Sequence, residues 1–201
     1  MKVSNNSIRS SSPLKSVIVL SDANDKESDP KTILTCLAIR QICKEKEDVN
    51  NPHIIAELMN RENRQIALDA GANEIVSAGF YRTGIMLQSA RYHNLSDIFH
   101  ELLIYEDNTS SIFILENEKI PKVIKDKTFL QASEIFSRNR EEKKPVILIG
   151  VRRLNSEGKP HVILNPLPKG KSKQSEFDVF RDGDALVVIA QCYPDLSFLK
   201  E

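Results

Sequence analysis

Two acidic side chains stand at the ends of apolar segments that read as buried strands. Glu57 closes the run HIIAE, and Asp22 follows the run SVIVLS. Ligands of open α/β folds bind at the carboxyl ends of parallel strands, so Asp22, Glu57 and the nearby Asn60 are the candidate ligand-binding residues. Oxygen atoms there could hold a ribose hydroxyl or a hard cation such as calcium. The alternative is that each side chain caps the next helix or pairs with a nearby Lys or Arg.

Other charged stretches have simpler interpretations. Asp25, Glu27 and Asp29 follow in the loop after the first strand and are interpreted as solvated charges, with a cation site as the less favoured alternative. The basic segment PKGKSKQ at 168–174 is interpreted as a solvated loop rather than a phosphate site. No pair of histidines has metal-ligand spacing, so no zinc site is assigned and the identity of any metal is left open.

Catalytic and phosphate-binding motifs are missing from the sequence. No GxGxxG follows a strand, and neither GxxxxGK[ST] nor GxSxG occurs. Cys36 and Cys43 lie seven residues apart, on one face of a predicted helix, and are interpreted as small buried apolar side chains. These observations predict a protein that is not an enzyme.

The elements that must position the carboxylates form an alternating pattern. Val17 to Leu20 is an apolar, β-branched run that predicts a strand buried on both faces. Asp29 and Pro30 read as the N-cap and first residue of a helix running to about residue 46. After the second strand, Asn60 can cap a short helix that ends at Gly71, and NEIVSA forms a third strand. This βαβαβ order predicts a parallel sheet with both helices on one face.

The pattern changes after Ala78. Residues 80–93 and 96–105 read as two consecutive helices, with Ser96 as the cap of the second. Their apolar surface exceeds what a half-sheet can cover, so a partner surface is expected there. From about Ser110, short strands, one helix and Asn/Gly/Pro turns predict a small α+β lobe. The expected dimer interface is formed by Ile85, Met86, Leu87, Ile98, Phe99, Leu102 and Leu103.

Composition excludes several classes of protein. The chain has 201 residues, 40% of them apolar, which is enough for one domain or two small ones. Lys+Arg and Asp+Glu both total 28, so no nucleic-acid partner is expected. No apolar stretch approaches the ~20 residues of a membrane span, and the N-terminus has no secretory signal. Three cysteines without a CxxC motif fit a reducing cytosol.

Several quoted segments together resemble one known family. SVIVLSD, DPKTILTCLAIR and HIIAELMNRENRQIALDAGANEIVSA resemble the second half of the regulator-of-potassium-conductance (RCK) domain, also called the TrkA nucleotide-binding fold. PVILIGVRR, VILNP and DGDALVVIA resemble its C-terminal lobe. Residues 1–16 are Ser/Asn-rich and without periodicity, which predicts a flexible tail. The resemblance implies an α/β protein with the C-terminal half of a Rossmann-like N-lobe at 17–79, a dimerising helix pair at 80–106 and a C-terminal lobe at 107–201.

The family resemblance also implies a function. Domains of this kind form the gating rings of potassium channels or the peripheral subunits of potassium uptake transporters, on the cytoplasmic side of the membrane. The expectation is therefore a ligand-sensing regulatory domain of a potassium channel, in a homodimer or higher oligomer attached to a membrane pore. A TrkA-like transporter subunit is the alternative. The implied ligand is a nucleotide or a divalent cation, with the phosphate-binding half expected outside this chain. Met59 replaces an acidic residue of some calcium-gated members.

Overall fold

The computed structural model describes residues 15–25, 27–45, 51–104, 106, 109–116, 121–140, 145–156, 158–167 and 179–199. The chain divides into two compact units, Met1–His93 and Asn94–Glu201. The division falls between two helices inside the predicted segment 80–106. The predicted tail at 1–16 and the basic segment 168–174 lie almost wholly or wholly outside the described residues. No helix in the described ranges is both long and apolar enough to cross a lipid bilayer.

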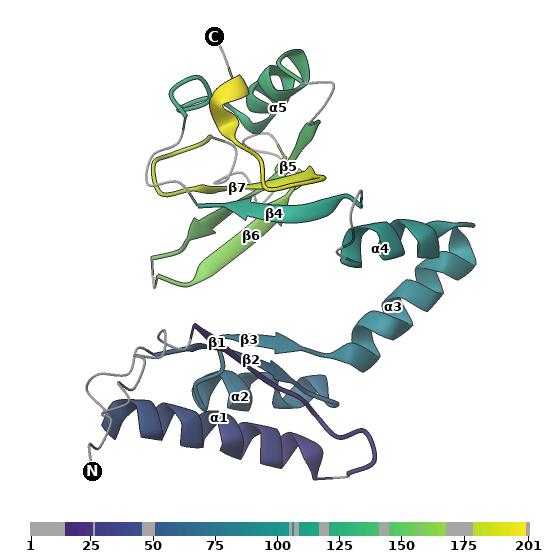
Figure 1. The fold of residues 1–201 in the computed structure, drawn as a ribbon, viewed down its shortest axis with the longest axis vertical. Coiled ribbons are helices and arrows are strands. Elements are labelled where there is room, and N and C mark those ends of the chain that lie inside the picture. The colour runs from purple at the N-terminus through teal and green to yellow at the C-terminus, as the bar shows by residue number, and fades with distance from the viewer. Residues whose placement is uncertain are drawn as a thin grey trace, which may run out of the picture. The chain divides into compact units, whose positions relative to one another are not determined.

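The N-terminal unit is built on a three-stranded parallel sheet with the order β1-β2-β3. Parallel pairing aligns Val19 with Ala56 and Ala56 with Ile75, so the carboxyl ends of the strands meet at one edge. The predicted βαβαβ order is confirmed, and Figure 1 shows both helices beneath one face of the sheet. The elements are β1 (Ser16–Val19), α1 (Ser28–Glu45), β2 (His53–Glu57), η1 (Arg61–Asn63), α2 (Arg64–Asp69) and β3 (Glu74–Val76).

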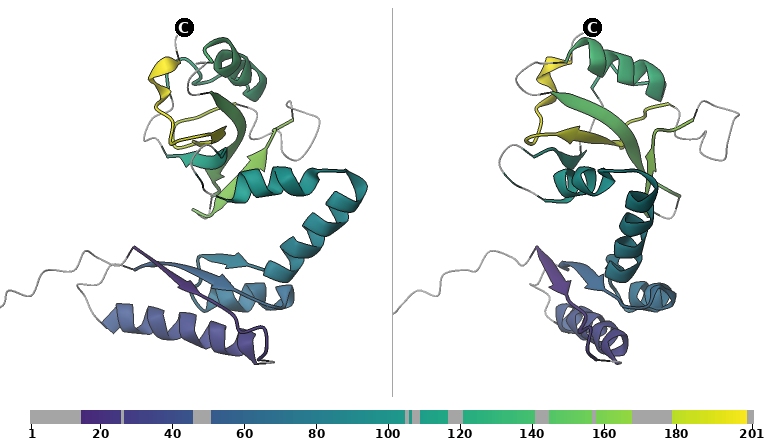
Figure 2. Two further views of the ribbon diagram at one scale, coloured as in Figure 1. Left: turned by 45° about the vertical axis from the view of Figure 1, so that its right-hand side comes forward. Right: turned by 90° about the vertical axis from the view of Figure 1, so that its right-hand side faces the viewer.

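Helices cover only one face of this sheet, as the two rotated views in Figure 2 also show. Alternate strand residues point to opposite faces, and Ile54 and Ala56 of β2, which face the helices, form a small core with Cys36 of α1 and Ala72 of the α2–β3 turn. On the other face, Ile18 is 65% exposed, and beyond the end of β1 Leu20 is 74% exposed. The prediction that the first strand is buried on both faces is therefore wrong. Within the described residues of the N-terminal unit, no second layer of helices covers this face.

Gly71 follows α2 with φ +101°, which confirms the predicted left-handed residue after the helix. A Cβ atom at this position would lie 2.4 Å from Cγ of Arg40. The Arg40 guanidinium donates to the carbonyl oxygens of Gly71 (2.8 Å) and Pro52 (2.9 Å) and to Asn73 Oδ1 (2.5 Å). One arginine of α1 thus ties the helix to the start of β2 and to the α2–β3 turn. The close approach explains why glycine is needed.

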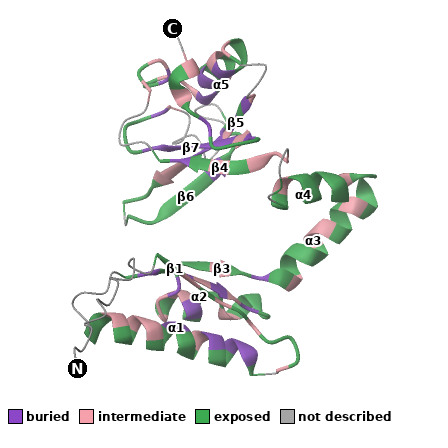
Figure 3. Ribbon diagram, viewed as in Figure 1, coloured by how far each residue is buried: buried purple, intermediate pink, exposed green. Residues whose placement is uncertain are grey.

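Two helices follow the sheet, α3 (Ala78–Arg91) and α4 (Leu95–Leu103). The second does not begin at a Ser96 cap as predicted, because Asn94 occupies the cap position in the left-handed conformation with φ 64°. Figure 3 shows that both helices are largely exposed. In the expected interface set, Ile85, Phe99 and Leu102 are half-buried, whereas four side chains are more than half exposed: Met86 (66%), Leu87 (68%), Ile98 (55%) and Leu103 (67%).

The C-terminal unit contains a four-stranded antiparallel sheet with the order β4-β7-β5-β6 and the helix α5, which confirms the predicted α+β lobe. Thr128 caps α5, and Gln131 completes a reciprocal capping box. Thirteen buried residues, with Phe136, Phe180 and Leu186 at the centre, form the core of this unit. The elements are β4 (Ser111–Leu115), α5 (Phe129–Arg138), β5 (Val146–Leu154), β6 (Pro160–Leu164), β7 (Ala185–Ala190) and η3 (Leu196–Phe198).

A buried ion pair joins strand β5 to the turn that precedes β7. Arg153 of β5 donates from Nε and Nη2 to the two carboxylate oxygens of Asp184, each at 2.6 Å. The Asp184 side chain is 2% exposed and also accepts from the Arg181 amide at 2.8 Å. Arg153 reaches the Val179 carbonyl oxygen as well, at 2.8 Å. The turn that precedes the central strand β7 is therefore fixed by charge-assisted hydrogen bonds.

Candidate functional site

The candidate site lies at the carboxyl ends of β1 and β2. Glu57 is the last residue of β2, and its Oε2 accepts a hydrogen bond from the Ser21 amide at 3.1 Å. The Ser21 hydroxyl lies 3.4 Å from the sulfur atom of Met59. These contacts join the loop after β1 to the loop after β2. Within the described part of the chain, Oε2 is the only oxygen of Glu57 that accepts a hydrogen bond from another residue.

Asp22 begins the loop between β1 and α1 and is exposed. Its Oδ1 accepts from the Asn24 amide at 2.9 Å, and its own amide donates to the Ser28 hydroxyl at 2.6 Å. Asp22 lines a cavity of about 260 Å³ beside α1 together with Asp25, Lys31 and Thr35. Glu57 and Asn60 are not among the residues lining this cavity. The cavity therefore does not unite the three sequence-predicted residues.

Asn60 is used mainly as a helix cap. Its Oδ1 accepts from the Glu62 amide at 2.9 Å at the start of η1, which is the capping role considered from the sequence. Its own backbone amide donates to Asp29 at 2.9 Å. The position therefore shapes the loop after β2, and its role toward a ligand stays a prediction.

Asp29 is the residue whose role sequence reasoning missed. It was predicted to be an exposed N-cap, but α1 begins at Ser28 and the Asp29 side chain is 5% exposed. Its Oδ1 accepts from the Met59 amide at 2.7 Å, and its Oδ2 accepts from the Asn60 amide at 2.9 Å and from Asn63 Nδ2 at 2.8 Å. The carboxylate thus holds the β2–α2 loop against the first turn of α1. The only signal in the sequence was an aspartate before proline, which also fits a cap.

The acidic loop does not assemble a metal centre within the described part of the chain. Asp25 pairs with Lys31, with 2.6 Å between Oδ2 and Nζ. This hydrogen bond, with a second from the Glu27 amide, holds the pKa of Asp25 below its usual range, and it raises the pKa of Lys31. No group of three or more His, Cys, Asp and Glu side chains is close enough to hold a metal ion among these residues. A calcium ion prefers six to eight oxygen ligands, so the residues present fit it poorly.

A sugar hydroxyl makes a smaller demand on these side chains than a calcium ion does. Each of Asp22 and Glu57 uses one carboxylate oxygen for a backbone amide. The second oxygen of each could accept a hydrogen bond from a sugar hydroxyl, and each such bond needs one acceptor rather than a full coordination shell. The phosphate groups of such a ligand would need donors other than the glycine-rich loop of dinucleotide folds, because that motif does not occur in the sequence.

Comparison with known proteins establishes no family. No protein-family model and no curated protein matches this chain. Similar solved structures include the GsuK channel bound to NAD (18% identity, 86% of this chain and 24% of that chain, TM-score 0.30). They also include the GsuK RCK domain (18%, 87% and 30%, TM-score 0.30) and the GsuK channel (16%, 86% and 25%, TM-score 0.29). This chain spans less than a third of each of those chains.

Proposed function

We propose that this chain is a ligand-sensing regulatory domain of a potassium channel, acting on the cytoplasmic side of the membrane without making or breaking covalent bonds. One observation carries the proposal. A parallel sheet covered on one face is followed by two helices with exposed apolar side chains and then by a separate α+β lobe. This is the order of parts that the sequence resemblance implies. An uncovered apolar surface of this kind favours assembly with other copies.

The proposed ligand is a nucleotide whose ribose contacts Asp22 and Glu57. A ligand changes the balance between two arrangements of a protein only through a difference in its affinity for them. Glu57 also accepts a hydrogen bond from the Ser21 amide. A ligand bound at this edge of the sheet would therefore change the conformation of the loops after both β1 and β2. Movement of those loops against a second copy is the proposed route to the pore.

The function is tested with the complete polypeptide that contains this chain. Rubidium flux into liposomes is measured with and without NAD, ATP or calcium, for the wild type and for Glu57→Gln and Glu74→Gln. Glu57→Gln keeps an acceptor for Ser21 but removes the charge, and it is expected to shift the half-maximal ligand concentration by about tenfold. Glu74, at the opposite end of the sheet, is the matched control and should leave the response unchanged.

Two results would contradict the proposal. Flux that is insensitive to all three compounds would remove the sensing role. A reading frame in which this chain is encoded apart from any pore would instead support the transporter subunit. Isothermal titration of the 201-residue chain with the same compounds separates loss of binding from loss of coupling to the pore.

The apolar surface of α4 gives a separate prediction about assembly. Leu103→Asp is expected to lower the apparent mass of the chain in solution, because an unpaired charge in an apolar contact is strongly unfavourable. Leu103 is 67% exposed, so the substitution should spare the fold of its own lobe. Leu130→Asp, at a 66% exposed leucine of α5, is the matched control. Equal masses by light scattering for both variants and the wild type would exclude α4 from the interface.

A further inference from the structure

A second cavity in the N-terminal unit is lined by none of Asp22, Glu57 and Asn60, although Arg61 in its wall directly follows Asn60. It has a volume of about 110 Å³ and sits between η1, the start of α2 and the start of α3. Its walls combine two cationic side chains, one hydroxyl and apolar or aromatic groups. The residues that line it are Arg61, Arg64, Ile75, Ser77, Phe80 and Tyr81.

Ser77 is a buried polar side chain in the wall of this cavity. It is 8% exposed, precedes α3 at the cap position, and makes no side-chain capping bond. Among the described residues, the side-chain oxygens of Ser89 and Ser133 have neither a hydrogen-bond partner nor contact with solvent. The Ser77 hydroxyl does not belong to this fully enclosed group. Its hydroxyl therefore has no hydrogen-bond partner among the described residues and is in contact with open space, and Ser77 lines this cavity. A buried hydroxyl without a partner calls for a ligand atom or water.

The start of α3 adds donors beside Ser77. The amides of Phe80 and Tyr81 already donate to the Ser77 carbonyl oxygen, at 3.0 and 3.1 Å. The two amides before them, of Ala78 and Gly79, have no acceptor within the helix. The partial positive charge of a helix of 14 residues is concentrated at this end, where it favours an anion.

The two arginines supply full charge, and one of them is held in place. The Arg61 guanidinium carbon lies 4.6 Å from the centre of the Phe80 ring, a cation–π contact that fixes the side chain at the cavity wall. Arg64, at the first position of α2, makes no ion pair or side-chain hydrogen bond within the described residues. A guanidinium matches a phosphate with two parallel hydrogen bonds, so a pair of them selects a doubly charged oxyanion.

We propose that this cavity binds a terminal phosphate group of a small molecule. Pockets that enclose a whole drug-sized ligand usually measure about 300–1,000 Å³, so this one admits the phosphate and leaves the remainder of the ligand outside. The half-exposed ring of Tyr81 stands next to it and offers a stacking surface for an aromatic base. The inference requires only residues 61–81 and does not rest on the proposed gating function.

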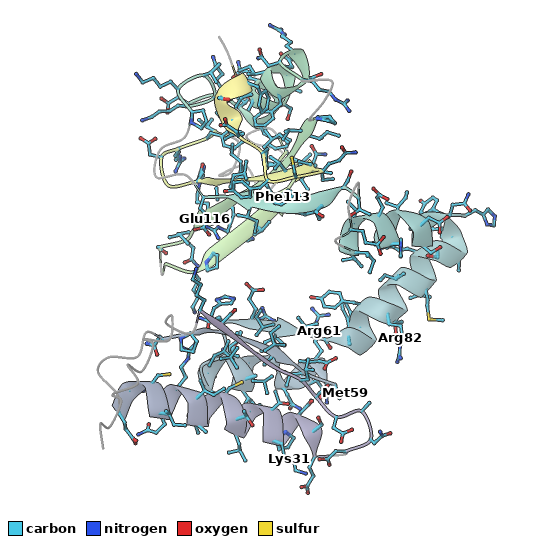
Figure 4. The ribbon with its side chains drawn as sticks, viewed as in Figure 1. Lys31, Met59, Arg61, Arg82, Phe113 and Glu116 are labelled. Atoms are coloured by element: carbon cyan, nitrogen blue, oxygen red, sulfur yellow. The ribbon has the colours of Figure 1, made fainter. Side chains whose placement is uncertain are left out.

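Isothermal titration of the 201-residue chain with inorganic phosphate, AMP and adenosine, at matched ionic strength in potassium chloride, tests the site. Phosphate and AMP are expected to bind and adenosine is not. Arg64→Gln should weaken binding by about tenfold or more, because a charge-assisted hydrogen bond is lost. Arg82→Gln is the control, because it makes the same change in charge on α3 at a residue that does not line the cavity. This variant should leave binding unchanged. Figure 4 labels both Arg61 and Arg82.

The same titrations distinguish a nucleotide from free phosphate as the ligand. Tighter binding of AMP than of inorganic phosphate identifies a nucleotide, and equal binding identifies free phosphate. Absence of binding by both would overturn the proposal. So would an equal loss in Arg64→Gln and Arg82→Gln, because it would show attraction to net charge rather than a site. Ser77→Ala, which removes the buried hydroxyl, should weaken binding without altering the circular dichroism spectrum.

Discussion

Arg153→Met is expected to destabilise the C-terminal lobe by about 3–5 kcal/mol, the usual cost of removing one partner from a buried ion pair. The Asp184 carboxylate is 2% exposed and would lose both hydrogen bonds from the guanidinium. The carbonyl oxygen of Val179 would lose its donor as well. Hydrogen exchange followed by mass spectrometry should show the loss as about a hundredfold or greater fall in protection of β7 peptides.

The neighbouring arginine provides the control. Arg152 points to the other face of the sheet and pairs with Glu116, whose side chain is 70% exposed, at 2.7 Å. An exposed pair of this kind contributes less than about 1 kcal/mol, so Arg152→Met should leave β7 protected. Peptides of β2 in the N-terminal unit give an internal reference. An equal change in β7 protection for both substitutions would show that the buried Arg153–Asp184 pair stabilises the lobe no more than the exposed Arg152–Glu116 pair does.

Asp29→Ala is expected to destabilise the N-terminal unit by about 3 kcal/mol. Three donors lose their acceptor together, namely the amides of Met59 and Asn60 and the side-chain amide of Asn63. Buried donors without a partner carry a cost of about 1–3 kcal/mol each, reduced here because the loop can reorient toward water. Thermal unfolding followed by circular dichroism, with exchange of the Met59 and Asn60 amides, measures the effect.

Asp25→Ala is the matched control for this change. Asp25 lies in the same loop and bonds mainly to Lys31, whose side chain is 65% exposed. Its removal should not change the unfolding temperature measurably, because exposed ion pairs contribute little. Unaltered exchange of the Met59 and Asn60 amides in Asp29→Ala would mean that the carboxylate does not hold the β2–α2 loop.

Patterns of local order were enough to predict most elements. The apolar runs gave β2 and β5, and Gly71 marked the end of α2 because only glycine readily adopts its conformation. The antiparallel lobe followed from short strands separated by turn residues. These features depend on residues close together in the sequence, which is why a single sequence can reveal them.

Features that depend on distant partners were not predicted. The sequence around Asp29 predicts a helix cap. Its side chain instead accepts hydrogen bonds from amides about 30 residues away, which local patterns do not reveal. Ile18 looked buried because β-branched residues are typical of a covered strand, whereas the layer that would cover it is not among the described residues. The cavity at Arg61 and Ser77 also depends on contacts between separate elements, because its walls combine η1 with the start of α3. Local sequence patterns therefore do not predict it.

The open face of the parallel sheet has a consequence for quality control. Ile18 and Leu20 stay in contact with water unless another surface arrives to cover them. Under the proposed function, that surface comes from a partner. An unassembled subunit therefore exposes apolar side chains that the assembled complex buries. Chaperones and proteases recognise such residues in cells. The half-life of the subunit would then report whether it has been incorporated, and surplus copies would be cleared without a dedicated degradation signal.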